Sequence, residues 1–396
     1  MRRCLSWAVV LVAIASAFLS AAALSGNAAK AEVIVLGAPI SLSGSYAKNG
    51  AFMRDGYKFA VQSINRAGGV VVRGKPYKLE LKFYDDRSRP DLSAAIAEKL
   101  IEQDRVRFLL GPYSTDLTEA VAPVAERYRV PLISGNAAGR SLYDKHYCCF
   151  FAVLSSTDRY FTALFASAKR ILKTEKRSHS GPITLAIATR GDRFSQDVRA
   201  SVLADAEKNG MRLVLDDRLP DPPTDLSSTL ARVRVLKPDI MVVSGRERGA
   251  IEAVNQFDAA DIDVPILAVS HCDSSKIIEQ TGKAAEGIYC PMQWIKSAAY
   301  RGKWFGSAAN FARHFEQKYG YEPPYHAAQS AAAVVVYADA LERAESIETE
   351  EVLDKVGDTK LDTFYGPVAF GPSGENIAKE MVVTRVVGGR HVVIQP

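Results

Sequence analysis

The sequence has few cysteines and little net charge. Only five of its 396 residues are cysteine, and 50 Lys and Arg against 45 Asp and Glu leave a formal net charge of +5. The cysteines and histidines show no CxxC motif and no other spacing typical of a zinc site. No basic stripe interleaved with aromatic residues is present, so we expect neither a metal nor a nucleic-acid partner.

Familiar catalytic motifs are also missing. The chain contains no GxSxG, HExxH, GxxxxGK[ST] or GxGxxG. Ser43 is a conceivable nucleophile, but the sequence identifies no histidine base and no acid to orient it. Asp85 and Asp86 are adjacent, yet no second acidic cluster joins them to form a metal site. We therefore expect a protein that is not an enzyme and has no cofactor.

Long apolar runs are confined to the N-terminus. Arg2 and Arg3 precede an apolar stretch over residues 7–19, and small residues follow as far as Ala31. This order is typical of a secretory signal peptide, and the apolar stretch is too short to span a bilayer comfortably. We expect export to the periplasm and cleavage after Ala31, with Ala23 and Ala29 as alternative sites.

Export makes disulfide bonds chemically possible. Cys272 follows one expected strand and Cys290 ends the next, so these two residues are a possible disulfide pair. Cys148 and Cys149 are adjacent in the chain. Adjacent residues of a strand point to opposite faces, so we do not expect these two to pair.

Strand and helix patterns alternate through most of the chain. Apolar runs predict strands, and periodic apolar positions predict helices between them. The expected strands are 33–36, 79–83, 108–110 and 130–133 in a first series, and 184–188, 212–215, 239–243 and 266–269 in a second. Such alternation predicts an α/β protein with two doubly wound parallel sheets, which suits the length of the chain.

Ligands of doubly wound sheets bind at the carboxyl ends of the strands. The stretches that follow the expected strands are 41–49, 111–116, 134–139, 190–194, 244–248 and 270–273. One of them holds Ser114 and Thr115 just before a helix that we expect from about Leu117. The first turn of a helix attracts anions, so this stretch is a candidate carboxylate site. Asp116 and Glu119 have the spacing of a capping box, so helix capping is the alternative interpretation for Asp116.

The same residues carry a family resemblance. The segments "ISLSGSYAKNG", "KFYDDRSRPDLSAAIAEKLI", "GPYSTDLTEAVAPVAERYRVPLIS", "AAEGIYC" and "FYGPVAFGPSGENI" occur in this order along the chain. Together they resemble the substrate-binding proteins of branched-chain amino acid ABC transporters. This is the leucine/isoleucine/valine-binding group of type I periplasmic binding proteins.

The resemblance implies two lobes joined by a three-crossing hinge, which close on a ligand like a Venus flytrap. We expect the crossings near Val153–Ser156, Gly287–Met292 and Thr363–Pro367. A signal peptide over 1–31 would precede lobe 1, made of 32–153 and 291–363. Lobe 2 would comprise 154–290 and 364–396.

The resemblance also implies a ligand site. In the family, hydroxyl and amide groups after a Gly-x-x-Ser-Ser strand end hold the ligand carboxylate, with help from an Ala-Ala-Thr loop. The ligand-binding residues that we expect are Ser43, Tyr46, Asn49, Tyr113, Ser114, Thr115, Asn136, Ala137, Ala138, Phe194, Arg246, His271 and Tyr325. Trp294 is a further candidate for an apolar wall.

This sequence departs from the family pattern in two places. Ala138 replaces the loop threonine. The acidic residue that holds the α-ammonium should fall within 269–272, where no carboxylate occurs unless Asp273 shifts into place. A desolvated ammonium without a carboxylate is costly. We therefore hypothesise a ligand that has a carboxylate but lacks an α-amino group.

The expected function is that of a monomeric periplasmic binding protein. It would capture a small carboxylate-bearing solute and deliver it to an inner-membrane ABC permease. The solute would be a branched-chain or other amino acid, or an aromatic or aliphatic organic acid or amide. A ligand sensor of the same fold and an exported hydrolase are the alternatives.

Overall fold

A computed structural model describes residues 32–174, 181–219, 225–245, 247–272 and 275–394 of the chain. The expected signal peptide, Arg246 and Asp273 lie outside these residues. Among the described helices, none combines the length and apolar character that crossing a membrane requires.

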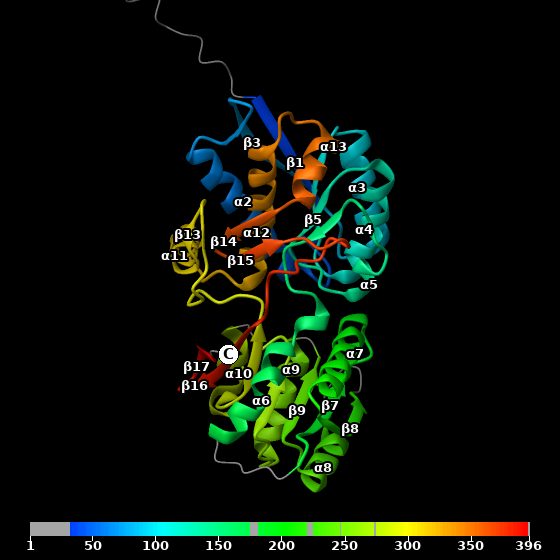
Figure 1. Ribbon diagram of the computed structural model, residues 1–396, viewed down its shortest axis with the longest axis vertical. Coiled ribbons are helices and arrows are strands. Elements are labelled where there is room, and N and C mark those ends of the chain that lie inside the picture. The colour runs from blue at the N-terminus through cyan, green and yellow to red at the C-terminus, as the bar shows by residue number, and fades with distance from the viewer. Residues whose placement is uncertain (1–31, 175–180, 220–224, 246, 273–274, 395–396) are drawn as a thin grey trace, which may run out of the picture.

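The upper lobe in Figure 1 is built on a six-stranded sheet in the order β2-β3-β1-β4-β5-β6. All neighbours are parallel except β2, which is antiparallel to β3. The strands are β1 (Glu32–Ile40), β2 (Val70–Val72), β3 (Lys75–Asp85), β4 (Phe108–Leu110), β5 (Leu132–Ser134) and β6 (Phe150–Ala152). The associated helices are α2 (Ala47–Arg66), α3 (Pro90–Glu102), α4 (Thr115–Tyr128), α5 (Arg140–Tyr143), α11 (Ala308–Tyr319), α12 (Tyr325–Arg343) and α13 (Thr349–Gly357).

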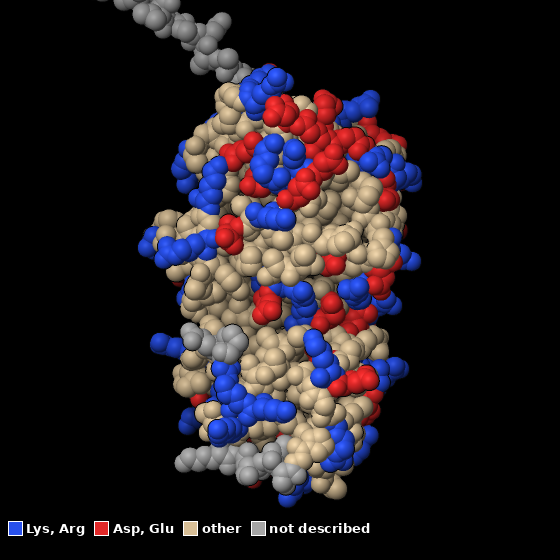
Figure 2. Space-filling model, viewed as in Figure 1, with Lys and Arg blue, Asp and Glu red and all other residues tan. Residues whose placement is uncertain are grey.

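The lower lobe holds a seven-stranded sheet in the order β17-β16-β11-β10-β9-β7-β8. Its strands are β7 (Thr184–Thr189), β8 (Arg212–Arg218), β9 (Ile240–Ser244), β10 (Ile266–Val269), β11 (Tyr289–Met292), β16 (Val382–Val387) and β17 (Arg390–Val393). Its helical segments are η2 (Thr157–Arg159), α6 (Thr162–Thr174), α7 (Arg193–Lys208), α8 (Ser227–Leu236), α9 (Glu247–Ala259), α10 (Ser275–Thr281) and η3 (Gly282–Ala285). The two sheets confirm the expected doubly wound architecture. On the face shown in Figure 2, acidic and basic side chains are interspersed.

Helix α12 occupies the centre of the upper lobe although it comes late in the chain (Figure 1). Its residues from Ala327 to Leu341 are buried with few exceptions, because the helix is apolar on almost every side. Small residues let α2 pack close to it: a β-carbon on Gly56 would lie 2.2 Å from the carbonyl oxygen of Ala327. This packing holds the start of α12 close to the junction of the lobes.

The chain passes between the sheets three times, and the third passage is later than the sequence predicts. The small hairpin β14 (Lys360–Thr363) and β15 (Gly366–Ala369) precedes a bridge between Ala152 of β6 and Glu375. Residues 366–376 therefore stay beside the upper lobe, and the crossing expected at Thr363–Pro367 falls between Asn376 and β16. Pairing of Glu375 with Ala152 of β6 sets the position of the third crossing, and no local sequence pattern predicts that pairing.

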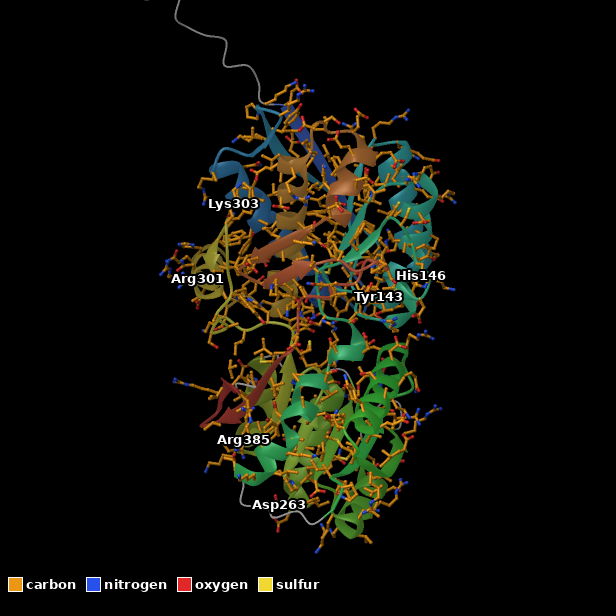
Figure 3. The ribbon with its side chains drawn as sticks, viewed as in Figure 1. Tyr143, His146, Asp263, Arg301, Lys303 and Arg385 are labelled. Atoms are coloured by element: carbon orange, nitrogen blue, oxygen red, sulfur yellow. A yellow bond between two sulfur atoms is a disulfide. The ribbon has the colours of Figure 1, made fainter. Side chains whose placement is uncertain are left out.

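Strand β16 pairs antiparallel with β11, and β17 pairs with β16 to form the edge of the lower sheet. Arg385 of β16 lies over the ring of Tyr289 at 5.4 Å, on the lower lobe in Figure 3. A second short hairpin lies on the upper lobe and consists of β12 (Arg301–Gly302) and β13 (Gly306–Ser307). Arg301 is labelled there in Figure 3. The hinge thus returns the chain to the lower lobe only for its last two strands.

The cysteines follow two patterns. Cys272 and Cys290 form a disulfide that ties the segment after β10 to β11, with α-carbons 5.7 Å apart. Cys148 and Cys149 lie in a bend before β6, and their sulfur atoms are 3.0 Å apart. The expectation that these two side chains point to opposite faces is wrong, because the bend replaces the strand geometry on which it depended. Together with Glu126, they place two sulfurs and a carboxylate within 4.8 Å of one another.

Candidate ligand-binding cleft

A cavity of about 250 Å³ opens between the two lobes. The upper lobe contributes the start of α4, the loop after β5 and the start of α12. The lower lobe contributes the segments after β7 and β10, and the first crossing adds two more side chains. The lining residues are Tyr113, Ser114, Thr115, Asp116, Asn136, Ala138, Leu154, Tyr160, Asp192, Arg193, Phe194, His271, Tyr325, His326 and Gln329.

The start of α4 forms one wall, and its geometry rules out the capping box. Ser114 has a φ of 71°, a region that non-glycine residues rarely occupy except under constraint. Its hydroxyl donates to Asp116, while its backbone N–H donates to the carbonyl of Asn136 at 3.1 Å. Glu119 accepts instead from the hydroxyl of Ser141, so the capping interpretation of Asp116 is wrong.

Thr115 is fixed by a close approach of Gly139. The backbone N–H of Gly139 donates to the Thr115 hydroxyl at 3.1 Å, and a β-carbon on Gly139 would lie 2.4 Å from Thr115 Cγ2. The hydroxyl accepts that bond, so it can donate its own hydrogen to a ligand. The first-turn N–H groups of α4 lie beside it and carry partial positive charge. This corner of the cavity suits a carboxylate oxygen.

The loop after β5 is held by α12. Asn136 donates its amide hydrogen to Ser330 Oγ at 2.8 Å, and its amide oxygen accepts from Gln329 at 2.8 Å. The backbone carbonyl of Ala138 accepts from the N–H of Thr157 at 2.9 Å, which joins the loop to the first crossing. Buried amides left without partners are costly, so these bonds tie the position of the loop to α12 and to the first crossing.

Aromatic rings dominate the opposite wall. The ring of Phe194 meets the His271 ring edge-on at 4.7 Å and the Tyr160 ring at 5.2 Å. Asp192 caps α7 by accepting from the backbone N–H of Ser195 at 3.2 Å. Arg193 extends beside them as an exposed side chain, paired with Asp197 at 3.5 Å. This wall combines flat apolar surface with a few adjustable charges.

His326, at the start of α12, brings an imidazole to the upper wall. Burial lowers the pKa of His326 to about 3, and the nearby His271 and Lys48 act in the same direction. The ring packs against the Tyr325 ring in a tilted arrangement with centroids 3.8 Å apart, and its centroid lies 5.5 Å from that of the Tyr113 ring. At neutral pH it is uncharged and adds to the aromatic surface.

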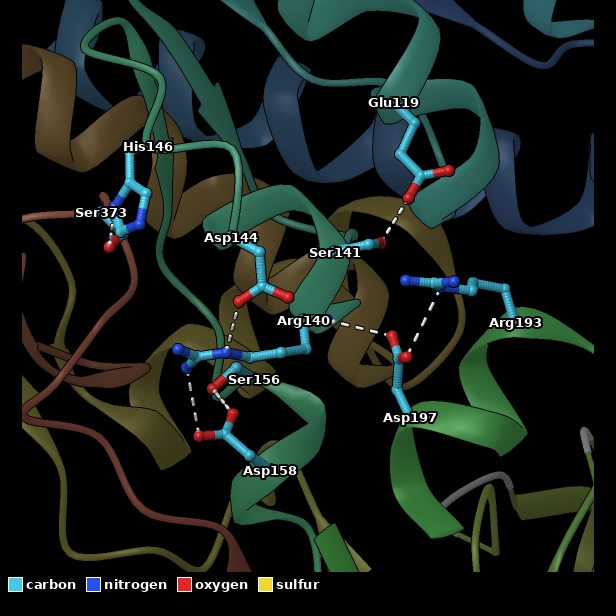
Figure 4. Close-up of polar contacts among 10 residues, drawn as sticks. All are labelled: Glu119, Arg140, Ser141, Asp144, His146, Ser156, Asp158, Arg193, Asp197 and Ser373. Carbon is cyan, nitrogen blue, oxygen red and sulfur yellow. Dashed lines mark hydrogen bonds and ion pairs between the residues drawn. The ribbon is translucent and has the colours of Figure 1, made fainter. Parts of the chain in front are cut away.

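Polar contacts join the lobes beside the cavity (Figure 4). The backbone N–H of Arg140 in the upper lobe donates to Asp197 of the lower lobe at 3.1 Å. Burial raises the pKa of Asp197, while Arg193 and this bond oppose the shift. On α2, Lys48 reaches Glu247 of α9 at 3.4 Å. These contacts connect the two lobes directly, outside the hinge.

Eight of the residues expected from the sequence line the cavity. They are Tyr113, Ser114, Thr115, Asn136, Ala138, Phe194, His271 and Tyr325. Four of the others do not line it. Ser43 donates to Asp85 at 2.7 Å on an exposed loop, Ala137 is fully buried, and Asn49 lies on α2. Tyr46 stands behind the wall, where its hydroxyl donates to Asp116 at 3.1 Å.

Trp294 is not a cleft residue either. Its side chain is buried in the upper lobe, where its indole N–H donates to the carbonyl of Phe364 at 3.0 Å. The sequence reasoning also missed several lining residues. Asp192 and Arg193 lie in residues 190–194, one of the stretches that follow an expected strand, but no sequence pattern selected these two residues. Tyr160, His326 and Gln329 carry no local signal, because the hinge and α12 bring them to the cleft.

Two doubly wound lobes that enclose a cavity of this kind define a two-lobed binding protein. The chain belongs to the periplasmic binding protein family, whose model matches residues 33–390. It is 21% identical to the leucine-, isoleucine-, valine-, threonine- and alanine-binding protein of Pseudomonas aeruginosa over 86% of each chain.

Many solved structures share the fold, and two of those that contain a bound small molecule bear on the cleft. One is the branched-chain amino acid transporter substrate-binding protein LivJ of Streptococcus pneumoniae in complex with isoleucine. It has a TM-score of 0.76 and 22% identity, over 92% of this chain and 100% of that one. The other is a solute-binding protein of an ABC transporter from R. palustris in complex with benzoate. It has a TM-score of 0.74 and 17% identity, over 91% of this chain and 95% of that one.

Proposed function

We propose that this chain is the periplasmic solute-binding component of an ABC transporter. It captures a small carboxylate-bearing solute between its lobes and delivers the solute to an inner-membrane permease. The observation that carries the proposal is the cavity, with helix-terminal donors on one wall and aromatic rings on the other. The family and the names of the relatives support the same role. The protein acts as a monomer, since one chain provides both walls.

The ligand carboxylate lies at the start of α4 in this proposal. The Thr115 hydroxyl and the first-turn N–H groups supply donors without a fixed positive charge. The body of the ligand extends toward Phe194, Tyr160 and His271, which offer ring faces and edges. A benzoate-type acid or an amino acid with an apolar side chain fills such a space.

Asp116 bears on whether the ligand has an amino group. Its carboxylate lines the cavity and accepts from Ser114 and Tyr46, and no described cation lies within ion-pair distance of it. The upper lobe therefore offers a carboxylate at the cavity in addition to Asp192, which lines it from the lower lobe. A ligand with an α-amino group could therefore pair with Asp116, and the absence of that group from the ligand stays a prediction for the ligand panel. An amino group, or the hydroxyl of an aromatic acid, is the ligand donor that suits Asp116.

A matched ligand panel tests the proposal. Thermal shift and calorimetry would compare leucine with isocaproate, phenylalanine with phenylpropionate, and benzoate with dihydroxybenzoate. We expect at least one carboxylate to raise the melting temperature and to bind at a stoichiometry of one per chain. A folded protein that responds to no carboxylate in the panel, but binds a neutral or cationic solute, would overturn the proposal.

A further inference from the structure

The three crossings of the hinge meet on one buried group of side chains. The backbone N–H of Ser155 donates to Gln293 Oε1 at 3.1 Å, and Gln293 Nε2 donates to the Ser155 carbonyl at 2.8 Å. Lys379 joins them from the third crossing: its Nζ donates to the Gln293 carbonyl at 2.5 Å, and its carbonyl accepts from Ser155 Oγ at 3.1 Å. Each crossing is thus bonded to the other two.

These polar side chains are almost inaccessible to solvent. Gln293 is 1% exposed, and Ser155 and Lys379 are 0% exposed. The Lys379 ammonium lies over the Tyr365 ring at 4.7 Å, and burial lowers the pKa of Lys379 to about 7. A buried polar group that loses its partner costs more than an exposed one, so the three crossings cannot move independently.

A single hydroxyl connects this hinge group to the cleft. The hydroxyl of Tyr365 lies 3.1 Å from Gln293 Oε1 and 3.0 Å from Gln329 Oε1. A phenol has one hydrogen, so Tyr365 can donate it fully to only one of these two acceptors at a time. The side chain therefore offers two discrete hydrogen-bonding arrangements, one directed to the hinge and one directed to α12.

The chain of bonds continues to the ligand-binding loop. Gln329 Nε2 donates to Asn136 Oδ1 at 2.8 Å, and both residues line the cavity. Asn136 in turn accepts the backbone N–H of Ser114 through its carbonyl. A displacement of Asn136 on ligand binding would therefore also displace Gln329, and through Tyr365 it would reach the hinge.

We propose that Tyr365 is a positioning residue that couples the ligand-binding loop to the hinge through Asn136, Gln329, Tyr365 and Gln293. Ligand binding at the Asn136 loop shifts the hydrogen of Tyr365 between its two acceptors and so biases the closure of the lobes. This inference rests on the proposed function for the ligand. The relay accounts for how ligand binding is transmitted to the hinge, and Tyr365 itself does not line the cavity.

The test compares Tyr365→Phe with Tyr337→Phe. Tyr337 is an equally buried tyrosine of the upper lobe whose hydroxyl approaches the carbonyls of Leu109 and Pro131 at 2.7 and 2.6 Å, away from the hinge. Both variants lose a buried hydroxyl, so both should melt at lower temperature. Only Tyr365→Phe should change the radius of gyration of the ligand-free protein in small-angle X-ray scattering.

Ligand binding provides a second readout. With leucine and benzoate as probes, Tyr365→Phe should change the affinity of whichever probe binds by about fivefold or more, a typical size for coupling between sites. Tyr337→Phe should keep the affinity within about twofold, as expected for a site far from the cleft. Tyr365→Phe behaving like Tyr337→Phe in both scattering and affinity would overturn the inference.

A second variant tests the hydrogen bond between Tyr365 and Gln329. Gln329→Met removes the acceptor on α12 while keeping the length of the side chain. The scattering effects of Gln329→Met and Tyr365→Phe should not add in the double variant, because both break one chain of bonds. Additive effects would overturn the relay. Scattering of the ligand-free protein needs no ligand, so failure of the relay remains distinguishable from failure of the proposed function, which the panel alone decides.

Discussion

The two walls of the cleft are built in different ways. The upper wall is fixed by the backbone: Gly139 is pressed against Thr115, Ser114 is held at a positive φ, and α12 satisfies the Asn136 amide. The lower wall is made of side chains, with Phe194 and His271 in edge-on contact. Fixed backbone donors suit a group that every ligand shares, while adjustable rings suit the part that varies. In the proposed function, the upper wall recognises the carboxylate and the lower wall selects the body of the ligand.

The largest effect is expected from Gly139→Ala on the upper wall. The new β-carbon would lie 2.4 Å from Thr115 Cγ2 and 2.8 Å from its hydroxyl oxygen. Overpacking of this kind costs up to about 3 kcal/mol, so we expect binding to weaken by about a hundredfold in calorimetry. The donor of the carboxylate corner is displaced while the fold remains.

Gly191→Ala is the control for this change. Gly191 lies beside the lower wall, next to Asp192, and a β-carbon there meets no atom within 4 Å. We expect its affinity to stay within about twofold of the unmodified protein, as for a surface substitution. Equal losses in both variants would contradict the contrast between a fixed and an adjustable wall.

The second effect concerns Asp116 and the amino group of the ligand. Asp116→Asn keeps the shape of the side chain and removes its charge. If the carboxylate holds an ammonium, the preference for leucine over isocaproate should fall by about thirtyfold, since charged hydrogen bonds contribute about 2 kcal/mol. Calorimetry with both ligands measures the change.

Asp91→Asn serves as its control, because Asp91 also lies in the first turn of a helix, α3, but on the surface. It should leave the preference unchanged. An unchanged preference in Asp116→Asn would instead mean that Asp116 only holds Ser114 and Tyr46 in place.

The third effect belongs to the lower wall. Phe194→Ala removes the ring that meets His271 and Tyr160. The lost apolar contact should weaken binding of benzoate or phenylalanine by about tenfold, corresponding to about 1.5 kcal/mol. Short aliphatic acids touch less of this wall, so their affinity should change less. A uniform loss across the panel would show that the lower wall does not select the body of the ligand.

The fourth effect is a pH dependence of protein stability that arises from His326 on the upper wall. The folded protein holds the pKa of His326 at about 3, below its usual 6.5, because burial disfavours the charged ring. The unfolded chain therefore binds the proton more readily, so His326 should lower the stability as pH falls from 6.5 toward about 3. His326→Phe should melt with a weaker pH dependence over this range than the unmodified protein. His314→Phe, at an exposed position of α11, should keep the original dependence.

The sequence predicted the upper wall of the cleft better than the lower wall. Ser114 and Thr115 were found because the carboxyl end of β4 meets the start of α4, a local relation. Asp116 was misinterpreted because its partner Tyr46 lies 70 residues away, and no spacing rule reports such a contact. His326 and Gln329 reach the cleft on α12, a helix whose position depends on its packing against α2. Sequence patterns thus predict the strand ends, and tertiary packing decides which other side chains meet there.

The smallest effect is expected at the rim, where Lys48 of α2 reaches Glu247 of α9 across the cleft. Both side chains are exposed, at 47% and 38%, so the pair contributes about 0.2–1 kcal/mol to closure. Glu247→Gln should therefore weaken ligand binding by no more than about fivefold, and the loss should disappear at high salt, because salt screens exposed charges. Glu322→Gln is the matched control. Its partner Lys296 is comparably exposed, but the pair joins the loops that flank α11 and does not cross the cleft.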